Sequence, residues 1–325
     1  MGGDHAPAEI VAGTIIANRA GLGRMALVGD REKLAPLLRG TGSEDIAIIH
    51  APGVIAMDDA PSLAVRNAAG TSLGVAVELV RDGTADAVVS AGNSGAFLAI
   101  ALIRLRTIPG IARPAIAAVM PTRSESPCVL LDAGANVDCR PEWLVQFAIM
   151  GSAYATAALG IKNPRVGLIS NGEERTKGNA QAIEAGALLE NAPVRFVGNV
   201  EGRDLFEGEV DVFVTDGFVG NVMLKLAEGA ASFFRDTLRE SFEHAAPLSK
   251  VGGLLSKPVF NAMRERLNYE NYGGAPLLGV RGNCIVAHGR SSRNAIASAI
   301  RAAAAEVNED VIGKIAQSVA QPVKT

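Results

Sequence analysis

The chain has 325 residues, of which 48% are apolar, and a formal net charge of -3. A chain of this length and composition can bury a substantial core as one large α/β domain or as two smaller ones. The nearly neutral charge argues against a nucleic-acid partner, which usually requires a basic excess.

Neither the cysteines nor the hydropathy pattern indicates a secreted or membrane-spanning protein. The three cysteines are odd in number and lack C-x-x-C spacing, so they predict no disulfide framework or zinc site and fit a reducing cytoplasm. The first residues lack the charged start and apolar core of a signal peptide. The longest uncharged run, residues 87–103, has polar residues and glycines in its middle, which divide it into a strand and a helix start.

The order of strand, polar glycine-containing turn and helix recurs along the chain. The opening stretch is one such unit, and residues 85–103, 127–151 and 164–189 are three others. This alternation predicts a mostly parallel sheet covered by helices, in a single domain of residues 1–325 or in two closely packed lobes. Because parallel strands bind ligands at their carboxyl ends, we expect the four turns to converge on one edge of the sheet.

The last third of the chain departs from this order. Residues 211–229 change from a buried strand to a helical period across a turn with two glycines. Residues 241–271 carry no strand signal and predict two short helices around a Gly-Gly and a Lys-Pro. A strand within residues 282–289 and one long helix over about residues 292–317 complete the prediction.

The turns have the chemistry of an anion site. Glycine lets backbone N–H groups approach a ligand, and a following helix N-terminus adds free donors and partial positive charge. For each turn the alternative is a tight connection without a ligand. Lys177 either meets a phosphate or is a solvated loop residue, whereas Asp216 and Asn221 either orient a substrate or cap a helix, with capping favoured on local grounds. His288, at a strand end, either has a structural role or contributes to the same ligand-binding edge of the sheet.

Several other kinds of catalytic site have no support in the sequence. It contains no G-x-S-x-G, no G-x-x-x-x-G-K-[ST] and no strand-linked G-x-G-x-x-G, which disfavours a serine hydrolase, an ATPase and a nicotinamide dehydrogenase. Cys284 and His288 are four residues apart, but no third ligand is evident. We therefore expect neither a metal nor another cofactor.

A series of motifs identifies a family. The segments "MGGDHAP", "SAGNSGA", "LLDAGANVDCRPEWLVQFAIMG", "NGEERTKGN", "GNVEGRD", "DGFVGNVMLK" and "YGGAPLLGVRG", followed by "AHGRS", resemble in this order the bacterial phosphate acyltransferase family, labelled PlsX. The resemblance covers nearly the whole chain. It implies transfer of a long acyl chain from acyl carrier protein to inorganic phosphate, giving an acyl phosphate for phospholipid synthesis.

The resemblance also implies a fold and an assembly. The expected fold is a three-layer α/β/α structure similar to isocitrate and isopropylmalate dehydrogenases and to phosphotransacetylase. The family forms dimers that associate peripherally with the membrane surface from the cytoplasm, where the expected downstream partner is a glycerol-3-phosphate acyltransferase. Its members usually have a short strand before "MGGDHAP", which we expect to be missing here through a late start site or a truncation.

The expected site residues lie in the motifs that match. We expect catalytic roles for Lys177, Asp216, Asn221 and His288. Phosphate binding is expected at glycine-rich turns, through Gly3, Asp4, Asn93, Ser94, Gly95, Asn136, Gly178, Asn179, Gly217 and Gly220. Because phosphate is itself the nucleophile and a thiolate is a fairly good leaving group, the reaction needs positioning and charge stabilisation more than a covalent intermediate.

Residues 241–271 are expected to form a protruding helical hairpin. An apolar stripe on it predicts membrane contact, with a dimer interface as the alternative, through Leu254, Leu255, Val259 and Phe260. A basic set in the last third is expected to dock the acidic carrier protein, with a solvated helix face as the alternative, and comprises Arg235, Arg239, Lys250, Lys257, Arg264 and Arg266.

Three other functions remain as alternatives. A phosphotransacetylase-like enzyme would transfer acyl groups between coenzyme A and phosphate. A related dehydrogenase would need a helix with aspartates four apart for a divalent metal, and only Asp82 and Asp86, across Gly83, have this spacing. A non-catalytic membrane scaffold would form no acyl phosphate at all.

Overall fold

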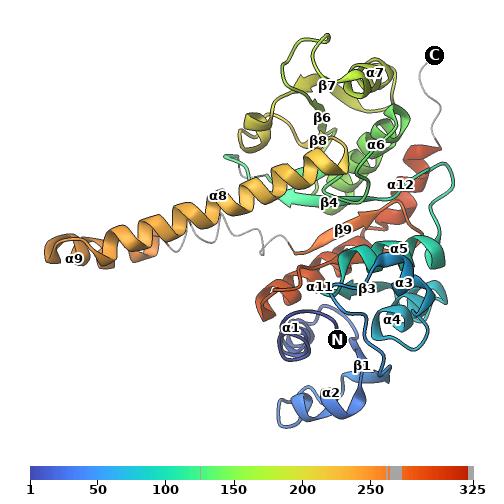
Figure 1. The fold of residues 1–325 in the computed structure, drawn as a ribbon, viewed down its shortest axis with the longest axis vertical. Helices are drawn as coiled ribbons and strands as arrows, with labels where there is room; N and C mark the ends of the chain where they lie inside the picture. Colours follow the sequence, from blue (N-terminus) through green and yellow to red (C-terminus); the bar gives the residue numbers. More distant parts are fainter. Residues whose placement is uncertain (125, 261–262, 264–272, 321–325) are drawn as a thin grey trace.

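The computed structural model describes residues 1–124, 126–260, 263 and 273–320. Figure 1 shows an α/β body from which a helical arm projects. The strands are β1 (Ala26–Gly29), β2 (Ala47–His50), β3 (Ala87–Ser90), β4 (Ala115–Met120), β5 (Cys128–Leu131), β6 (Arg165–Ile169), β7 (Arg195–Val200), β8 (Val212–Val214), β9 (Ala275–Leu278) and β10 (Asn283–Val286). The helices are α1 (Ala8–Arg19), α2 (Arg31–Leu38), α3 (Pro61–Arg66), α4 (Ser72–Arg81), α5 (Ser94–Leu105), α6 (Pro141–Ala158), α7 (Ala180–Leu189), the 3-10 helix η1 (Gly202–Phe206), α8 (Gly217–Glu243), α9 (Pro247–Leu255), α11 (Arg293–Asn308) and α12 (Val311–Val319).

Eight of the described strands form one mixed sheet in the order β3-β10-β9-β4-β5-β8-β6-β7, and β1 and β2 form a separate parallel pair. β3 and β10 are parallel to each other, and β5, β8, β6 and β7 form a parallel block. Between them, the pairings β10–β9, β9–β4 and β4–β5 are all antiparallel. An odd number of reversals means that β3 and β10 run opposite to β5, β6 and β8.

The prediction that four turns converge on one edge is therefore wrong. The turns that follow β3 and β10 lie at one end of the strands, together with the opening turn. The turns that follow β5, β6 and β8 lie at the other end. The strand-and-helix order of the sequence does not reveal this reversal, because it depends on where β4 and β9 insert between the two parallel blocks.

Helices cover both faces of the sheet, which confirms the α/β fold. Successive residues of a strand point to opposite faces. In the parallel block, Leu131 and Val214 pack in the cluster of α6, whereas Leu130 and Phe213 pack in a cluster with the start of α8. Near β3, two further clusters lie on opposite faces, one with α4 and α5 and one with α11.

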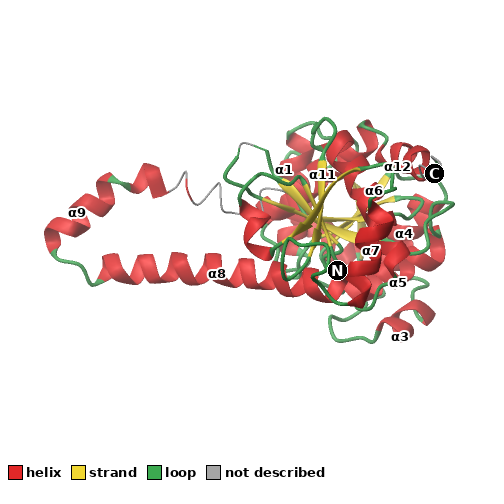
Figure 2. Ribbon diagram, turned by 90° about the horizontal axis from the view of Figure 1, so that it is seen from above, coloured by secondary structure: helices red, strands yellow, loops and turns green. Residues whose placement is uncertain are grey.

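The arm is longer than the predicted hairpin. Its outgoing limb is α8, whose 27 residues extend for about 40 Å at the usual helical rise. Figure 2 shows that only the start of α8 lies against the body and that α9 lies at the far end of the arm. Gly252 and Gly253 belong to α9 rather than to a turn, and Gly253 lies where a Cβ would come within 2.6 Å of the ring of Phe242.

Other predictions for the last third need a similar correction or lie outside the described residues. The predicted helix over residues 292–317 is two helices, α11 and α12, because Asp310 adopts a left-handed conformation (φ 46°) and caps α12. Arg264 and Arg266, and the side chains of Lys250 and Leu254, lie outside the described part of the chain.

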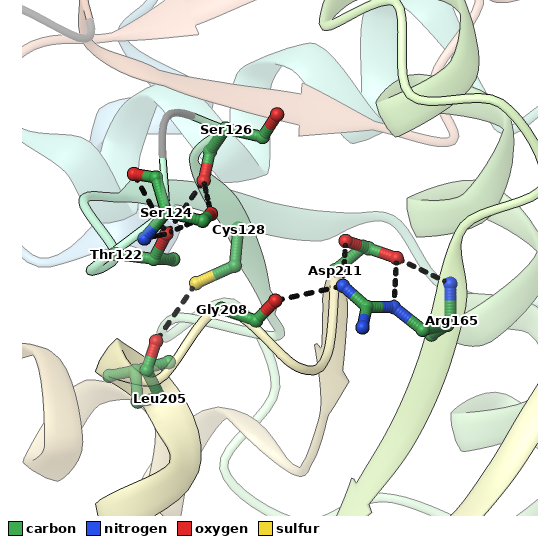
Figure 3. A network of polar contacts seen from close by, with 8 residues as sticks. All are labelled: Thr122, Ser124, Ser126, Cys128, Arg165, Leu205, Gly208 and Asp211. Carbon is green, nitrogen blue, oxygen red and sulfur yellow. Dashed lines mark hydrogen bonds and ion pairs between the residues drawn. The ribbon is translucent and has the colours of Figure 1, made fainter.

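Polar contacts join the amino ends of the parallel block (Figure 3). Arg165, at the start of β6, donates through Nε and Nη2 to the carboxylate of Asp211 at 3.0 and 2.9 Å, and also to the carbonyl of Gly208. Nearby, the Cys128 thiol donates to the carbonyl of Leu205. These hydrogen bonds connect the starts of the strands to neighbouring loops. A ligand site is instead expected at the carboxyl end of the block, where parallel strands usually bind ligands.

Candidate active site

Of the helices that follow strands of the parallel block, α7 and α8 are each capped by a side chain. The Oδ1 of Asn179 accepts a hydrogen bond from Ala182 N at 2.8 Å at the start of α7. The Oδ1 of Asp216 accepts one from Val219 N at 2.8 Å at the start of α8, which confirms the capping interpretation of Asp216. Two helix N-termini, with their remaining N–H donors and positive dipole ends, suit an anion.

A pocket of about 430 Å³ lies between these helix starts. Its wall combines apolar side chains with polar groups from the ends of β6 and β8, and is formed by Leu144, Leu168, Ile169, Ser170, Asn171, Gly178, Asn179, Gln181, Ala182, Thr215, Asp216 and Val219. An adjoining depression of about 690 Å³ shares Asn179, Gln181, Asp216 and Val219 and adds Val137, Asp138, Cys139 and Phe218. Such a site can hold an anion next to an apolar group.

Gln181 and Asp132 shape the walls of this region. The Nε2 of Gln181 donates to the carbonyl of Cys139 at 2.6 Å, which joins α7 to the loop before α6. Asp132, fully buried after β5, accepts from Ile116 N, Gly134 N and Ala135 N through Oδ1. Its Oδ2 accepts from the backbone and side-chain nitrogens of Asn136 at 2.7 and 2.8 Å.

Asp132 fixes the turn that carries Asn136. Burial raises the pKa of Asp132 above its ordinary value, although hydrogen bonds from Ala135 and Asn136 act in the opposite direction. The other donor contact of the Asn136 amide is the carbonyl of Pro114 at 2.8 Å. Asn136 is thus held on both sides and contributes by shaping the turn.

The glycines at the start of α8 are explained by close packing. A Cβ on Gly217 would lie 2.6 Å from the carbonyl oxygen of Asn136, and a Cβ on Gly220 would overlap the carbonyl oxygen of Asp132. The side chain of Asn221 lies against Gly134, 3.5 Å from the position of a Cβ there. The first turn of α8 therefore packs directly on the 132–136 turn.

Lys177 lies in the turn between β6 and α7 and is exposed. Its backbone N–H donates to the carbonyl of Glu174, and no ion pair holds its ammonium among the described residues. The next residue, Gly178, has φ +106°, and its N–H donates to the Oδ1 of Asn171 at 2.8 Å. Lys177 lines neither the pocket described above nor the depression beside it, and its side chain is exposed rather than buried.

The remaining predicted residues form a second group at the opposite strand ends. Asn93 caps α5 through Oδ1, and its Nδ2 donates to the carbonyls of Ala56, Met57 and Asp59, so its amide is fully used. Ser94 and Gly95 are exposed in the first turn of α5.

The opening turn and the loop after β10 complete this second group. Gly3 lies so close to the backbone that a Cβ would be 2.6 Å from the carbonyl oxygen of Ala91. Asp4 lies 3.6 Å from the guanidinium of Arg290, whose backbone N–H donates to the Nδ1 of the exposed His288 at 3.2 Å. His288 is thus separated in the fold from the turns that hold Lys177 and Asp216.

The sequence reasoning missed Asp132, Ser170, Thr215 and Gln181. An acid directly after the buried run Cys128–Leu131 was a signal for Asp132, whereas Gln181 has no local signal because its partner is 42 residues away.

Within the described residues, no three His, Cys, Asp or Glu side chains gather as a metal site would require. No helix in the described part of the chain is long and apolar enough to cross a membrane.

Solved structures with a similar fold include enzymes that handle phosphate. A phosphotransacetylase from Streptococcus pyogenes matches with a TM-score of 0.64 and 18% identity, over 94% of this chain and 92% of that chain. A branched-chain phosphotransacylase from Enterococcus faecalis matches with a TM-score of 0.59 and 15% identity, over 95% and 97%. A 4-hydroxythreonine-4-phosphate dehydrogenase from Klebsiella pneumoniae matches with a TM-score of 0.53 and 14% identity, over 91% and 94%. At these identities the likeness concerns the fold.

Sequence comparison is more specific. The family model described as "Fatty acid synthesis protein" matches residues 1–314. The chain is 49% identical over 320 residues to a phosphate acyltransferase of Pelotomaculum thermopropionicum, covering 98% of this chain and 93% of the relative. It is 48% identical over 323 residues to a phosphate acyltransferase of Myxococcus xanthus, covering 98% and 92%. The chain, with its anion-suited pocket between two helix starts, belongs to the phosphate acyltransferase family.

Proposed function

We propose that this protein transfers a fatty acyl group from acyl carrier protein to inorganic phosphate, giving an acyl phosphate for phospholipid synthesis. The observation that carries the proposal is the pocket between the N-termini of α7 and α8, in a chain of the phosphate acyltransferase family. Helix N-termini supply donors for phosphate, and the apolar wall suits the start of an acyl chain.

In the proposed reaction a phosphate oxygen attacks the thioester carbonyl carbon. The carbon–sulfur bond breaks, and the thiolate leaves with the carrier and takes up a proton. Free N–H groups in the first turns of α7 and α8 are the donors for phosphate and for the carbonyl oxygen as it gains negative charge. Lys177 adds a cation, and the Oδ2 of Asp216 accepts the remaining phosphate O–H while Oδ1 caps α8.

The other predicted residues act indirectly in this proposal. Asn136, Gly217, Gly220 and Asn221 position the first turn of α8, and Gly178 and Asn179 position that of α7. The group of Gly3, Asp4, Asn93, Ser94, Gly95 and His288 lies at the other strand ends, and we assign it no contact with the reacting atoms.

A second candidate is acyl transfer between coenzyme A and phosphate. The fold similarity to phosphotransacetylase favours it, although the sequence relatives are named phosphate acyltransferases. The deciding experiment incubates the purified protein and phosphate with an acyl thioester of carrier protein or of coenzyme A, and traps acyl phosphate with hydroxylamine. Acyl phosphate from the carrier thioester at a much higher kcat/KM is expected. Preference for the coenzyme A thioester would favour the second candidate, and no acyl phosphate from either would refute both.

The arm serves assembly and membrane contact in this proposal. Large exposed apolar residues at helical spacing form a face of α8, which we assign to a second copy of the chain: Phe218, Val222, Leu226 and Phe233. Beyond it, Leu248, Leu255 and Val259 are 84%, 77% and 69% exposed beside Lys257, and we assign them to peripheral contact with an anionic membrane on its cytoplasmic side. Phe260, which was predicted to join them, is half-buried, and its ring centroid lies 5.4 Å from that of Phe242. There a downstream enzyme such as a glycerol-3-phosphate acyltransferase would receive the acyl phosphate.

A further inference from the structure

Two arginines lie over the single tryptophan of the chain. The guanidinium carbon of Arg113, in the loop before β4, is 5.2 Å from the ring centroid of Trp143, and that of Arg140 is 5.8 Å away. Both arginines are exposed, whereas Trp143 is half-buried and packs against the core cluster of α6. We call these three residues the arginine–tryptophan surface.

This surface borders the candidate active site. Arg140 directly follows Val137, Asp138 and Cys139, which line the depression that adjoins the pocket. Arg113 precedes Pro114, whose carbonyl accepts a hydrogen bond from the Asn136 amide in the same turn. A partner bound on the arginine–tryptophan surface would therefore sit at the mouth of the site.

The charges of this surface have no carboxylate partner. Within the described residues, neither Arg113 nor Arg140 forms an ion pair. The arginines predicted to dock the carrier differ in this respect, because Arg235 lies 3.3 Å from Asp236 and Arg239 lies 2.9 Å from Glu243 on the same helix. Arg235 and Arg239 are thus already paired with local acids, whereas Arg113 and Arg140 are not, although the exposed Asp138 and Glu142 are close to Arg140 in the sequence.

Helix stability does not explain Arg140. It occupies the N-cap position of the 18-residue helix α6 and makes no side-chain capping bond. A cation at this end faces the positive end of the helix dipole, which is the unfavourable position. The cation–π contacts of Arg113 and Arg140 with Trp143 restrict the two guanidinium groups but leave N–H donors for bidentate bonds to carboxylates. Because these side chains are already restricted, they lose less rotamer entropy when a partner binds.

We propose that the arginine–tryptophan surface docks an acidic face of the carrier protein that delivers the acyl thioester to the pocket. This inference rests on the proposed function, since it names the surface that recognises the donor. Charge complementarity at an exposed rim acts mainly through encounter and specificity, and it weakens as salt rises.

The test compares two charge-reversal pairs in the full-length protein. Arg113→Glu with Arg140→Glu changes the charge of the proposed surface. The matched control, Arg235→Glu with Arg239→Glu, makes the same change on α8. At low salt the first variant is expected to raise KM for the acylated carrier about tenfold, with kcat and the KM for phosphate little changed, and the control to change it less than about twofold. Arg113→Lys with Arg140→Lys should restore part of the affinity.

Binding without turnover separates this proposal from the proposed function. Fluorescence anisotropy of labelled carrier protein is expected to show salt-sensitive binding to the wild type that is weakened in the Arg113→Glu, Arg140→Glu variant. Such binding without acyl phosphate formation would refute the proposed reaction and leave the docking surface standing. An unchanged carrier KM and affinity would overturn the docking proposal. So would an altered oligomeric state of the variant by size-exclusion chromatography, or an equal loss of activity with a small pantetheine thioester.

Discussion

Gly220 shows why a glycine is needed where α8 meets the 132–136 turn. A Cβ there would overlap the carbonyl oxygen of Asp132, which is backbone and has little room to move. Gly229 lies in the same helix with nothing within 4 Å of its Cβ position. The two glycines therefore form a matched pair in which only the surroundings differ.

We expect opposite effects from alanine at these two positions. Gly220→Ala should destabilise the protein by about 3 kcal/mol through overpacking. Gly229→Ala should stabilise it by about 0.5 to 1 kcal/mol, because alanine loses less entropy in a helix. Urea unfolding of both variants measures the difference. Equal midpoints for the two variants would mean that the start of α8 shifts freely on the 132–136 turn.

Removing the positive charge of Lys177 tests the proposed anion site. Because its side chain is exposed, the contact with phosphate is screened by water, and Lys177→Ala should raise KM for phosphate by about fivefold rather than by orders of magnitude. Steady-state rates over a phosphate series give this value. Lys162→Ala, an exposed lysine before the opposite end of β6, is the control. A similar change in both variants would indicate a general charge effect.

Among individual residues, the sequence predicted local chemistry better than distant partners. The cap formed by Asp216 follows from its position before a helix, and the structure confirms it. The packing reason for Gly220 was not predictable, because Asp132 is 88 positions earlier and reaches α8 only through the pairing of β5 with β8. A local sequence pattern identifies a turn. The role of each residue in that turn depends on contacts that form only when the strands of the sheet pair.

At the scale of elements, α8 connects the site to the arm. Its N-terminus borders the pocket, and its exposed apolar face continues away from the body. The sequence predicted this helix from its period but not its length, because Gly229 inside it resembles an end signal.

The apolar face of α8 is expected to hold a dimer. Leu226 and Phe233 are 71% and 74% exposed, which is costly for large apolar side chains unless a partner covers them. Leu226→Glu with Phe233→Glu should give a monomer by light scattering while vesicle binding persists. A dimer that survives this double substitution would place the interface elsewhere.

The far end of the arm is expected to bind lipid. Burying two leucine side chains is worth about 3 to 6 kcal/mol, enough to decide between bound and free protein. Leu248→Glu with Leu255→Glu should therefore abolish co-sedimentation with vesicles that contain anionic lipid, while the dimer and the activity in solution remain. Each double variant serves as the control for the other. If the Leu248→Glu, Leu255→Glu variant dissociated and still bound vesicles, the two assignments would have to be exchanged.

At the scale of the whole molecule, two parallel blocks of opposite direction divide the predicted site. Strand and helix order predicted the α/β fold, and the alternation of buried residues places helices on both faces. The shared edge was not predictable, because the direction of β3 relative to β5 depends on β9, which comes from residues 275–278 and pairs with β4. Insertion of a late strand into the middle of a sheet leaves no local pattern.

Glu306 offers a test of how the whole fold responds to pH. It lies on α11 with only 3% of its surface exposed, and its Oε1 has no hydrogen-bond partner among the described residues. Burial raises the pKa of Glu306 to about 8. Below its ordinary pKa the carboxyl is protonated in both the folded and the unfolded chain, so its contribution to stability is fully present. Between that value and about 8 the folded state holds a proton that the unfolded state releases, and stability falls as pH rises.

Glu306→Gln keeps the size of the side chain and removes the titration. The variant and the wild type should therefore have similar Tm values near pH 5, whereas at pH 8.5 the variant should melt higher by about 4 °C or more. All other titrating groups, including Asp132, are common to both proteins, so the difference between the two Tm curves isolates Glu306. Scanning calorimetry from pH 5 to pH 9 provides the curves. Two curves that run parallel over this range would mean that water or a rearrangement of α11 stabilises the ionised carboxylate.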